Sequence, residues 1–259
     1  MRHHHRQISG DAARPCLVFL HEGLGCDAMW GSFPDQLCEA TGLAGLVYDR
    51  QGYGRSAPLD RPRTVHYLHE YALNELPSVL EALLPERDYI LIGHSDGGSI
   101  ALLHAAEQSP RLKAVVILAA HVFVEDVTLA GIRQAREAWD AGKLAGLARF
   151  HGDKTETLFH AWADAWLSPG FVHWNIEYAL PSISCPTLAL QGEHDQYGSA
   201  AQLDAIAGKT QNGRQLTLPN CGHSPHLEAP QATRDATARC AAPRGTSGCT
   251  AISKNRRNR

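Results

Sequence analysis

One serine lies where the chain can make a nucleophile. From Tyr89 to Gln108 the sequence reads YILIGHSDGGSIALLHAAEQ: an apolar run, a glycine-rich turn, and apolar residues at helical spacing. Gly-x-Ser-x-Gly between a strand and a helix is the nucleophile elbow, a turn sharp enough to strain the serine backbone. Gly93 and Gly97 leave room for the turn, while the N–H groups of the following helix point back at Ser95. A hydroxyl held in this way attacks acyl carbons when a base removes its proton.

Short apolar runs alternate with helical segments on both sides of this turn. Strands are predicted at 15–20, 43–49, 89–92, 112–120, 187–190 and 214–218. Helices are predicted at 28–41, at 66–84 with an interruption at Pro77, and after the elbow. The strands are apolar nearly throughout, which indicates a parallel sheet that is buried on both faces.

The alternation breaks between residues 121 and 184, where helical stretches carry many aromatic side chains and no strand is evident. We interpret this segment as a helical cap inserted over one end of the sheet. The prediction is an α/β fold with a mostly parallel central sheet and helices on both faces. Its core spans 1–120 and 185–242, and its cap spans 121–184.

An acid and a histidine follow two of the later strands. Asp195 lies in Gly-Glu-His-Asp after the strand that begins at 187, and His223 lies in Cys-Gly-His after the last strand. Five loops thus carry polar motifs at strand ends, in the order HEGLG, YDRQGYGRSAP, GHSDGG, GEHD and CGHSPHLE. Over residues 15–230 the chain resembles the serine hydrolases of the α/β-hydrolase superfamily, in particular the short-capped esterase, lactonase and C–C hydrolase group.

The resemblance implies a triad of Ser95, His223 and Asp195. His223 takes the serine proton, and Asp195 holds the imidazole in the required tautomer and stabilises its charged form. Other acids remain open at this stage: Glu193 is closer to the strand, and Glu125 or Asp126 follows the preceding strand. His226, three residues beyond His223, is expected at the surface or against the cap.

Two backbone N–H groups are expected to bind the oxyanion that develops during acyl transfer. One belongs to Asp96, directly after the nucleophile, and the other to the HEGLG loop, where Gly23 is favoured and Leu24 is second. We expect His21 to brace this loop and the Asp49-Arg50 pair to organise the next one.

The substrate pocket has weaker indications. Glu22 is an extra carboxylate where the family usually has glycine after histidine, and it would disfavour anionic substrates. His94 inside the elbow and the cap residues Trp139, Trp162 and Trp166 are further candidates for lining the pocket, which would suit an apolar substrate.

These residues predict an enzyme that hydrolyses a small carboxylic ester or lactone through an acyl-serine intermediate, with activity that rises as His223 loses its proton. The alternatives are a C–C bond hydrolase of a ring-cleavage product and a non-catalytic small-molecule binding protein on the same scaffold. No spacing of histidines and acids suggests a metal, and no glycine-rich loop suggests a dinucleotide, so no cofactor is expected.

Composition limits the remaining classes. The 259 residues carry a net charge of −3 and no apolar run long enough for a membrane span, so neither nucleic acid nor membrane is expected as a partner. No signal peptide is evident at the N-terminus.

Seven cysteines, an odd number without a Cys-x-x-Cys pair, favour free thiols in the cytoplasm. Residues 243–259 are polar and finally basic, which predicts a disordered tail. Nothing indicates the oligomeric state.

Overall fold

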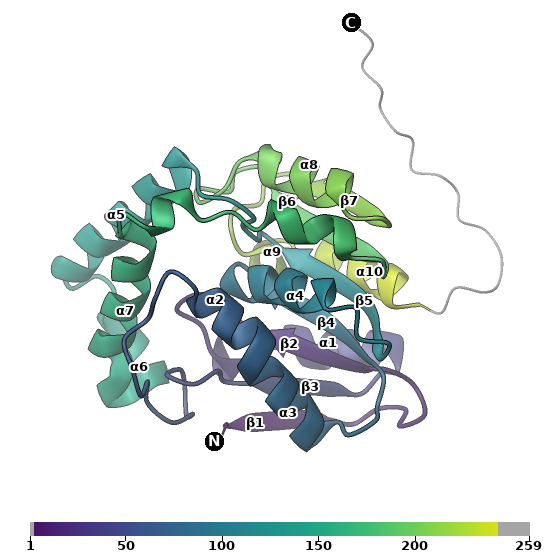
Figure 1. Ribbon diagram of the computed structural model, residues 1–259. Helices are drawn as coiled ribbons and strands as arrows, with labels where there is room; N and C mark the ends of the chain where they lie inside the picture. Colours follow the sequence, from purple (N-terminus) through teal and green to yellow (C-terminus); the bar gives the residue numbers. More distant parts are fainter. Residues whose placement is uncertain (1–2, 243–259) are drawn as a thin grey trace, which may run out of the picture.

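The computed structural model describes residues 3–242 of the chain. Within them, seven strands form one sheet in the order β1-β3-β2-β4-β5-β6-β7, and all neighbours are parallel except β1 and β3 (Figure 1). The strands are β1 (His5–Ile8), β2 (Cys16–Leu20), β3 (Gly45–Tyr48), β4 (Tyr89–His94), β5 (Leu112–Leu118), β6 (Thr187–Gly192) and β7 (Gly213–Leu218). This sheet confirms the predicted fold class. The predicted disordered tail lies outside the described residues.

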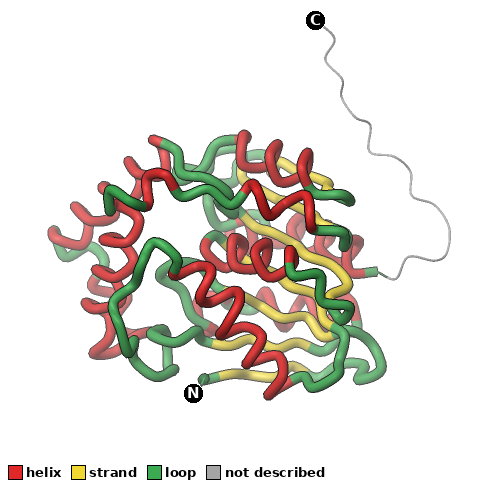
Figure 2. The backbone as a smooth tube through the Cα atoms, in the orientation of Figure 1, coloured by secondary structure: helices red, strands yellow, loops and turns green. Residues whose placement is uncertain are grey.

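Helices cover both faces of the sheet, so strands (yellow) lie between helices (red) in Figure 2. One face packs against α2 (Tyr67–Glu70), the π-helical turn η2 (Tyr71–Glu75), α3 (Leu76–Leu83), α4 (Asp96–Ala106) and α8 (Ala200–Lys209). The other face packs against α1 (Phe33–Thr41) and α10 (Pro230–Ala241). Successive strand residues alternate between these two cores: Val18 contributes to the first and Leu17 to the second.

The segment between β5 and β6 is helical, as the sequence predicted, and is called the β5–β6 segment below. Its elements are α5 (Asp126–Asp140), η3 (Ala145–Leu147), α6 (Ala148–His151), η4 (Gly152–Lys154), α7 (Thr155–Leu167), η5 (Phe171–His173) and η6 (Glu177–Ser182). In Figure 1, α5, α6 and α7 stand together beyond one end of the strands. Stacked rings join α5 and α7, because the centroids of Trp139 and Phe159 lie 4.3 Å apart.

Four local features differ from the sequence prediction or refine it. The edge strand β1 was not predicted. The helix expected from residue 28 is a 3₁₀ turn, η1 (Asp27–Trp30), followed by α1. The predicted interruption near Pro77 takes the form of the π-helical turn that ends at Glu75, consistent with a proline that cannot donate to the preceding turn. A short helix, α9 (Pro225–Glu228), follows β7. No helix within residues 3–242 has the length and hydropathy to cross a bilayer.

Candidate active site

Ser95 lies at the tip of the turn between β4 and α4, in a backbone conformation that side chains rarely adopt. Its φ and ψ are 51° and −118°, which is the strain expected of a nucleophile elbow. A Cβ added to Gly97 would lie 2.0 Å from the Leu20 carbonyl oxygen, and one on Gly93 would lie 2.3 Å from the Gly97 oxygen. The two glycines are therefore required by close backbone approach on both sides of Ser95.

The loops after β6 and β7 bring an acid and an imidazole to this serine. Ser95 Oγ lies 3.0 Å from His223 Nε2, and His223 Nδ1 lies 2.8 Å from Asp195 Oδ1. A carboxylate only accepts, so Nδ1 carries the proton and Nε2 is left as the acceptor for the serine hydroxyl. The arrangement can therefore move the serine proton to an imidazole whose opposite side faces a carboxylate.

Asp195 is the acid that reaches His223, and its side chain is only 2% exposed. Burial alone raises the pKa of Asp195, but hydrogen bonds from His223 and from the Tyr197 N–H outweigh burial and keep the pKa below its ordinary value. The three alternative acids are arranged differently. Glu193 and Asp126 are exposed, and Glu125 accepts hydrogen bonds from Ser199 and Gln202.

Hydrogen bonds fix the direction of one backbone N–H in the loop after β2. The Glu22 carbonyl accepts hydrogen bonds from Arg50 Nη2 and His21 Nδ1, both at 2.9 Å. In a planar trans peptide the C=O and the next N–H point in opposite directions, so the Gly23 N–H is directed away from Arg50. Gly23 lies beside the elbow, because a Cβ added there would be 3.2 Å from Asp96 Oδ2. The geometry thus favours Gly23 and Asp96 as a pair of donors.

The second candidate donor in this loop, Leu24, is already occupied. Its N–H donates to Glu22 Oε2 at 2.7 Å, which favours the Gly23 N–H over the Leu24 N–H as the donor to an oxyanion. The same bond gives Glu22 a structural partner that the sequence did not reveal. Burial raises the pKa of Glu22, and the Leu24 N–H and His223 only partly oppose this rise.

Two aromatic residues of the β5–β6 segment lie close to the elbow, one against the loop after β2 and one against Tyr67. Trp162 packs on the loop after β2 (residues 21–25, called the oxyanion loop below), since a Cβ on Gly23 would lie 2.3 Å from its Nε1. Trp166 Nε1 donates to Tyr67 Oη at 2.8 Å, and Tyr67 donates to Asp96 Oδ2 at 2.7 Å. Burial, and then the charge of Asp96, raise the pKa of Tyr67, so its phenol keeps the proton that it donates. The third candidate, Trp139, stacks on Phe159 instead of on a triad residue.

A group of imidazoles lies behind the base. His94 donates from Nε2 to the His223 carbonyl at 2.8 Å and so ties the base loop to β4. His226 is 5% exposed and packs 4.7 Å from the Trp30 ring and 4.8 Å from the His94 ring. The expectation that His226 lies at the surface or against the cap is wrong, because α9 turns this side chain into the core.

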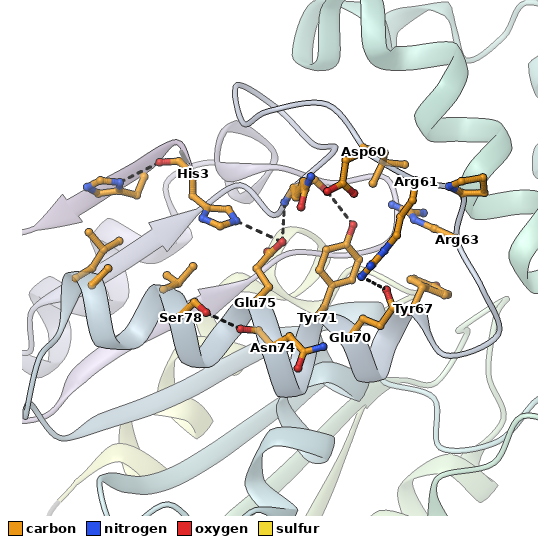
Figure 3. A pocket seen from close by; sticks show the side chains of 17 residues that line it. His3, Asp60, Arg61, Arg63, Tyr67, Glu70, Tyr71, Asn74, Glu75 and Ser78 are labelled. Atoms are coloured by element: carbon orange, nitrogen blue, oxygen red, sulfur yellow. Dashed lines mark hydrogen bonds and ion pairs between the residues drawn. The ribbon is translucent and has the colours of Figure 1, made fainter. Parts of the chain in front are cut away.

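An open cavity of about 620 Å³ lies between β1 and the helices α2 and α3. Figure 3 shows Glu75 facing His3 within it, at 3.3 Å, and Arg61 paired with Glu70 at 2.9 Å. Tyr67 is shared by this cavity and the elbow, but no triad residue lines it. Across residues 3–242, no group of three or more histidine, cysteine or acidic side chains is placed to hold a metal ion.

Comparison with known proteins places this geometry in a family. Residues 17–236 match the alpha/beta hydrolase family. The chain belongs to this family. It is 28% identical to the human serine hydrolase BPHL over 190 residues, which cover 70% of this chain and 64% of that protein. It therefore spans just under two thirds of the length of the first curated relatives that it matches.

Two further similarities cover more of the chain. The mouse sn-1-specific diacylglycerol lipase ABHD11 is 26% identical over 261 residues, covering 88% of this chain and 81% of the lipase. The crystal structure of the enol-lactonase from Burkholderia xenovorans LB400 superposes with a TM-score of 0.72 at 20% identity. It covers 92% of this chain and 95% of that one, and shows that the fold is shared.

Several residues at the site of this α/β-hydrolase were not singled out from the sequence. Tyr197 packs 4.7 Å from the His223 ring, and His121 donates to the Tyr197 carbonyl at 3.0 Å. Tyr67 and His151 reach the site from outside the motif loops. Only Tyr197 had a sequence signal, because it lies two residues after the acid; the others follow from packing between distant segments.

Proposed function

We propose that this chain is a serine hydrolase that cleaves small carboxylic esters or lactones through an acyl-serine intermediate. The observation that carries the proposal is the continuous hydrogen-bond path from Ser95 through His223 to Asp195, at 3.0 and 2.8 Å. The strained elbow at Ser95 and the position of Gly23 beside Asp96 support the same chemistry. The N–H groups of these two residues would stabilise the oxyanion that forms when a carbonyl carbon is attacked.

In the first half-reaction His223 Nε2 removes the Ser95 proton as Oγ attacks the carbonyl carbon. The carbonyl oxygen becomes an oxyanion, which the N–H groups of Gly23 and Asp96 stabilise. The imidazolium then returns its proton to the leaving alkoxide. Asp195 remains ionised throughout, consistent with the low pKa given by its hydrogen bonds to His223 and Tyr197.

In the second half-reaction a water replaces the alcohol. His223 removes a proton from this water as it attacks the acyl-serine, the oxyanion forms again in the same place, and Ser95 leaves with the proton from the imidazolium. A lactone follows the same steps, with its ring oxygen as the leaving group.

The β5–β6 segment acts as a cap in this proposal, over a core formed by residues 1–120 and 185–242. Its support is the packing of Trp162 on Gly23 and the hydrogen bond from Trp166 to Tyr67. Indole rings beside the elbow favour apolar substrates. Glu22 disfavours anionic ones, since a substrate carboxylate near it adds repulsion and loses hydration.

The test is turnover of short-chain p-nitrophenyl esters and of simple lactones by the wild type and by Ser95→Ala. Loss of the nucleophile is expected to lower kcat by roughly 10⁴ or more, because only the oxyanion hole and substrate binding remain. Circular dichroism checks that the variant is folded. Near-normal hydrolysis by Ser95→Ala refutes the assignment.

Two further measurements separate the proposed activity from other uses of the same scaffold. A fluorophosphonate probe is expected to label Ser95 in the wild type, and absence of the adduct indicates a protein that binds without catalysis. A vinylogous diketone acid, the substrate type of C–C bond hydrolases, is expected to turn over far more slowly than the esters. Faster cleavage of the diketone acid overturns the ester proposal.

A further inference from the structure

The β5–β6 segment also meets the oxyanion loop through a buried imidazole. His151, at the end of α6, is 3% exposed. Its Nε2 lies 2.9 Å from the Leu24 carbonyl oxygen, and its Nδ1 lies 2.9 Å from the Gly54 nitrogen. One side chain therefore bridges the loop after β2, the loop after β3 and the β5–β6 segment.

The two partners of His151 determine its protonation state. A carbonyl oxygen only accepts, so Nε2 must carry a hydrogen toward Leu24. A backbone N–H only donates, so Nδ1 must keep its lone pair toward Gly54. Only the neutral Nε2–H tautomer satisfies both bonds. A protonated ring would direct a second N–H at the N–H of Gly54 and break the bridge.

The bridge acts on the part of the loop that the proposed reaction uses. Leu24 is held on both sides, with its N–H on the Glu22 carboxylate and its carbonyl on His151. Gly23 precedes it directly, and the Glu22 carbonyl before Gly23 is held by Arg50. With these groups fixed, the Gly23 peptide has one orientation. Loss of the His151 bond frees the Leu24 end of this arrangement.

We propose that His151 is a positioning residue, which holds the Gly23 N–H in place through Leu24 and releases it when the imidazole is protonated. The inference rests on the proposed function, because it assumes that Gly23 binds the oxyanion. His151 itself touches neither substrate nor Ser95 in this mechanism. Its effect is transmitted through the backbone of the oxyanion loop.

The surroundings of His151 keep it neutral under ordinary conditions. Burial lowers the pKa of His151. The Leu24 carbonyl and the Asp49 carboxylate raise this pKa in part, and the ammonium of Lys154 lowers it further. His21, from the loop after β2, is a further titratable group close enough for its charge to interact with that of His151. Lys154 also donates to the Gly54 carbonyl at 2.7 Å, so the same two segments are joined twice. The bridge is therefore expected to break only at a pH below the ordinary pKa of a histidine side chain.

The kinetic test compares His151→Leu with His173→Leu, which removes an exposed histidine of the same segment. His151→Leu is expected to lower kcat by roughly tenfold or more with little change in KM, a part of the 10²–10³-fold loss that follows removal of an oxyanion donor. The control is expected to stay within about twofold of the wild type. Unchanged kcat in a folded His151→Leu variant overturns the proposal.

The pH dependence gives a readout that a purely structural role would not change. In the wild type acid also breaks the His151 bridge, so log(kcat/KM) is expected to fall more steeply at low pH than in His151→Leu. In His151→Leu the bridge is already absent at every pH, so this additional acid loss is expected to disappear. An acid limb that is identical in the two proteins contradicts the bridge.

Nitrogen-15 NMR of the histidine rings decides the tautomer in the wild type without any substrate. At pH 7.5 the signal absent from His151→Leu is expected to show an unprotonated Nδ1 and a protonated Nε2. The opposite tautomer, or a charged ring, overturns the bridge even if esters are hydrolysed. If instead Ser95→Ala hydrolyses as fast as the wild type, the proposed function fails while the tautomer still decides whether the bridge exists.

Discussion

His226 is a test of how buried imidazoles control the acid stability of this fold. It packs between Trp30 and Phe33, with ring centroids 4.7 and 5.9 Å away, and its Nδ1 is buried without a partner among residues 3–242. Burial, and then the charge of His223, lower its pKa from 6.5 to about 3. The folded protein therefore favours the neutral ring, whereas the unfolded chain takes up a proton near pH 6.5.

The magnitude follows from this difference in proton binding. Between pH 6.5 and pH 3 the unfolded state binds more protons, so the free energy of unfolding falls as pH falls through this window. Each pH unit costs about 1.4 kcal/mol, which gives about 2 kcal/mol for His226 between pH 7 and pH 5. His226→Phe removes this titration and keeps a flat ring against Trp30 and Phe33. The variant is expected to lose about 2 kcal/mol less stability than the wild type over that range.

Urea unfolding at pH 7 and pH 5, followed by tryptophan fluorescence, measures the loss of unfolding free energy in the wild type and in His226→Phe. The comparison uses the change between the two pH values, so any packing cost of the phenylalanine cancels. His173→Phe, at an exposed position, serves as the control and is expected to behave as the wild type. Equal losses in the wild type and in His226→Phe would refute the reasoning, since they would show that His226 is protonated without penalty in the folded state.

Two further variants test the proposed chemistry. Asp195→Asn retains the geometry but favours the wrong tautomer of His223, so kcat at pH 7.5 is expected to fall by roughly 10⁴; a loss below tenfold in ester assays would assign the acid elsewhere. Gly23→Ala places a Cβ 2.3 Å from Trp162 Nε1 and displaces the oxyanion loop, so kcat is expected to fall roughly 10²–10³-fold. Gly146→Ala, where a Cβ meets nothing within 4 Å, is the control, and equal kcat in both variants contradicts the assigned donor.

The strands other than β1 and the order of the triad residues were predictable from sequence because each leaves a local signal. Strands buried on both faces are continuous apolar runs, and β4 ends in a glycine pattern that only a tight turn requires. Asp195 and His223 follow from the ends of β6 and β7, since the carboxyl ends of parallel strands meet at one edge. In the structure His223 is within hydrogen-bond distance of both Ser95 and Asp195.

The sequence was less informative where the structure depends on which of several partners a side chain contacts. Leu24 was a candidate donor because any loop N–H has the same chemistry; the choice depends on whether the Glu22 carboxylate folds back on it. His226 was expected outside because its spacing from His223 does not reveal which way α9 turns. The edge strand β1 pairs with β3 through backbone bonds and carries histidine, arginine and glutamine, so it lacks the apolar run of a buried strand.

The oxyanion loop is assembled by neutral imidazoles that act as donor and acceptor at once. His21 donates from Nδ1 to the Glu22 carbonyl and accepts the Arg50 N–H at Nε2, so it too must be uncharged, and burial, followed by Arg50, keeps its pKa well below 6.5. His151 does the same for Leu24 and Gly54. A proton on either ring turns an acceptor into a donor that faces another donor, and a bond is lost. Acid therefore acts on this loop separately from the base His223, so the loop is expected to add its own loss of activity at low pH.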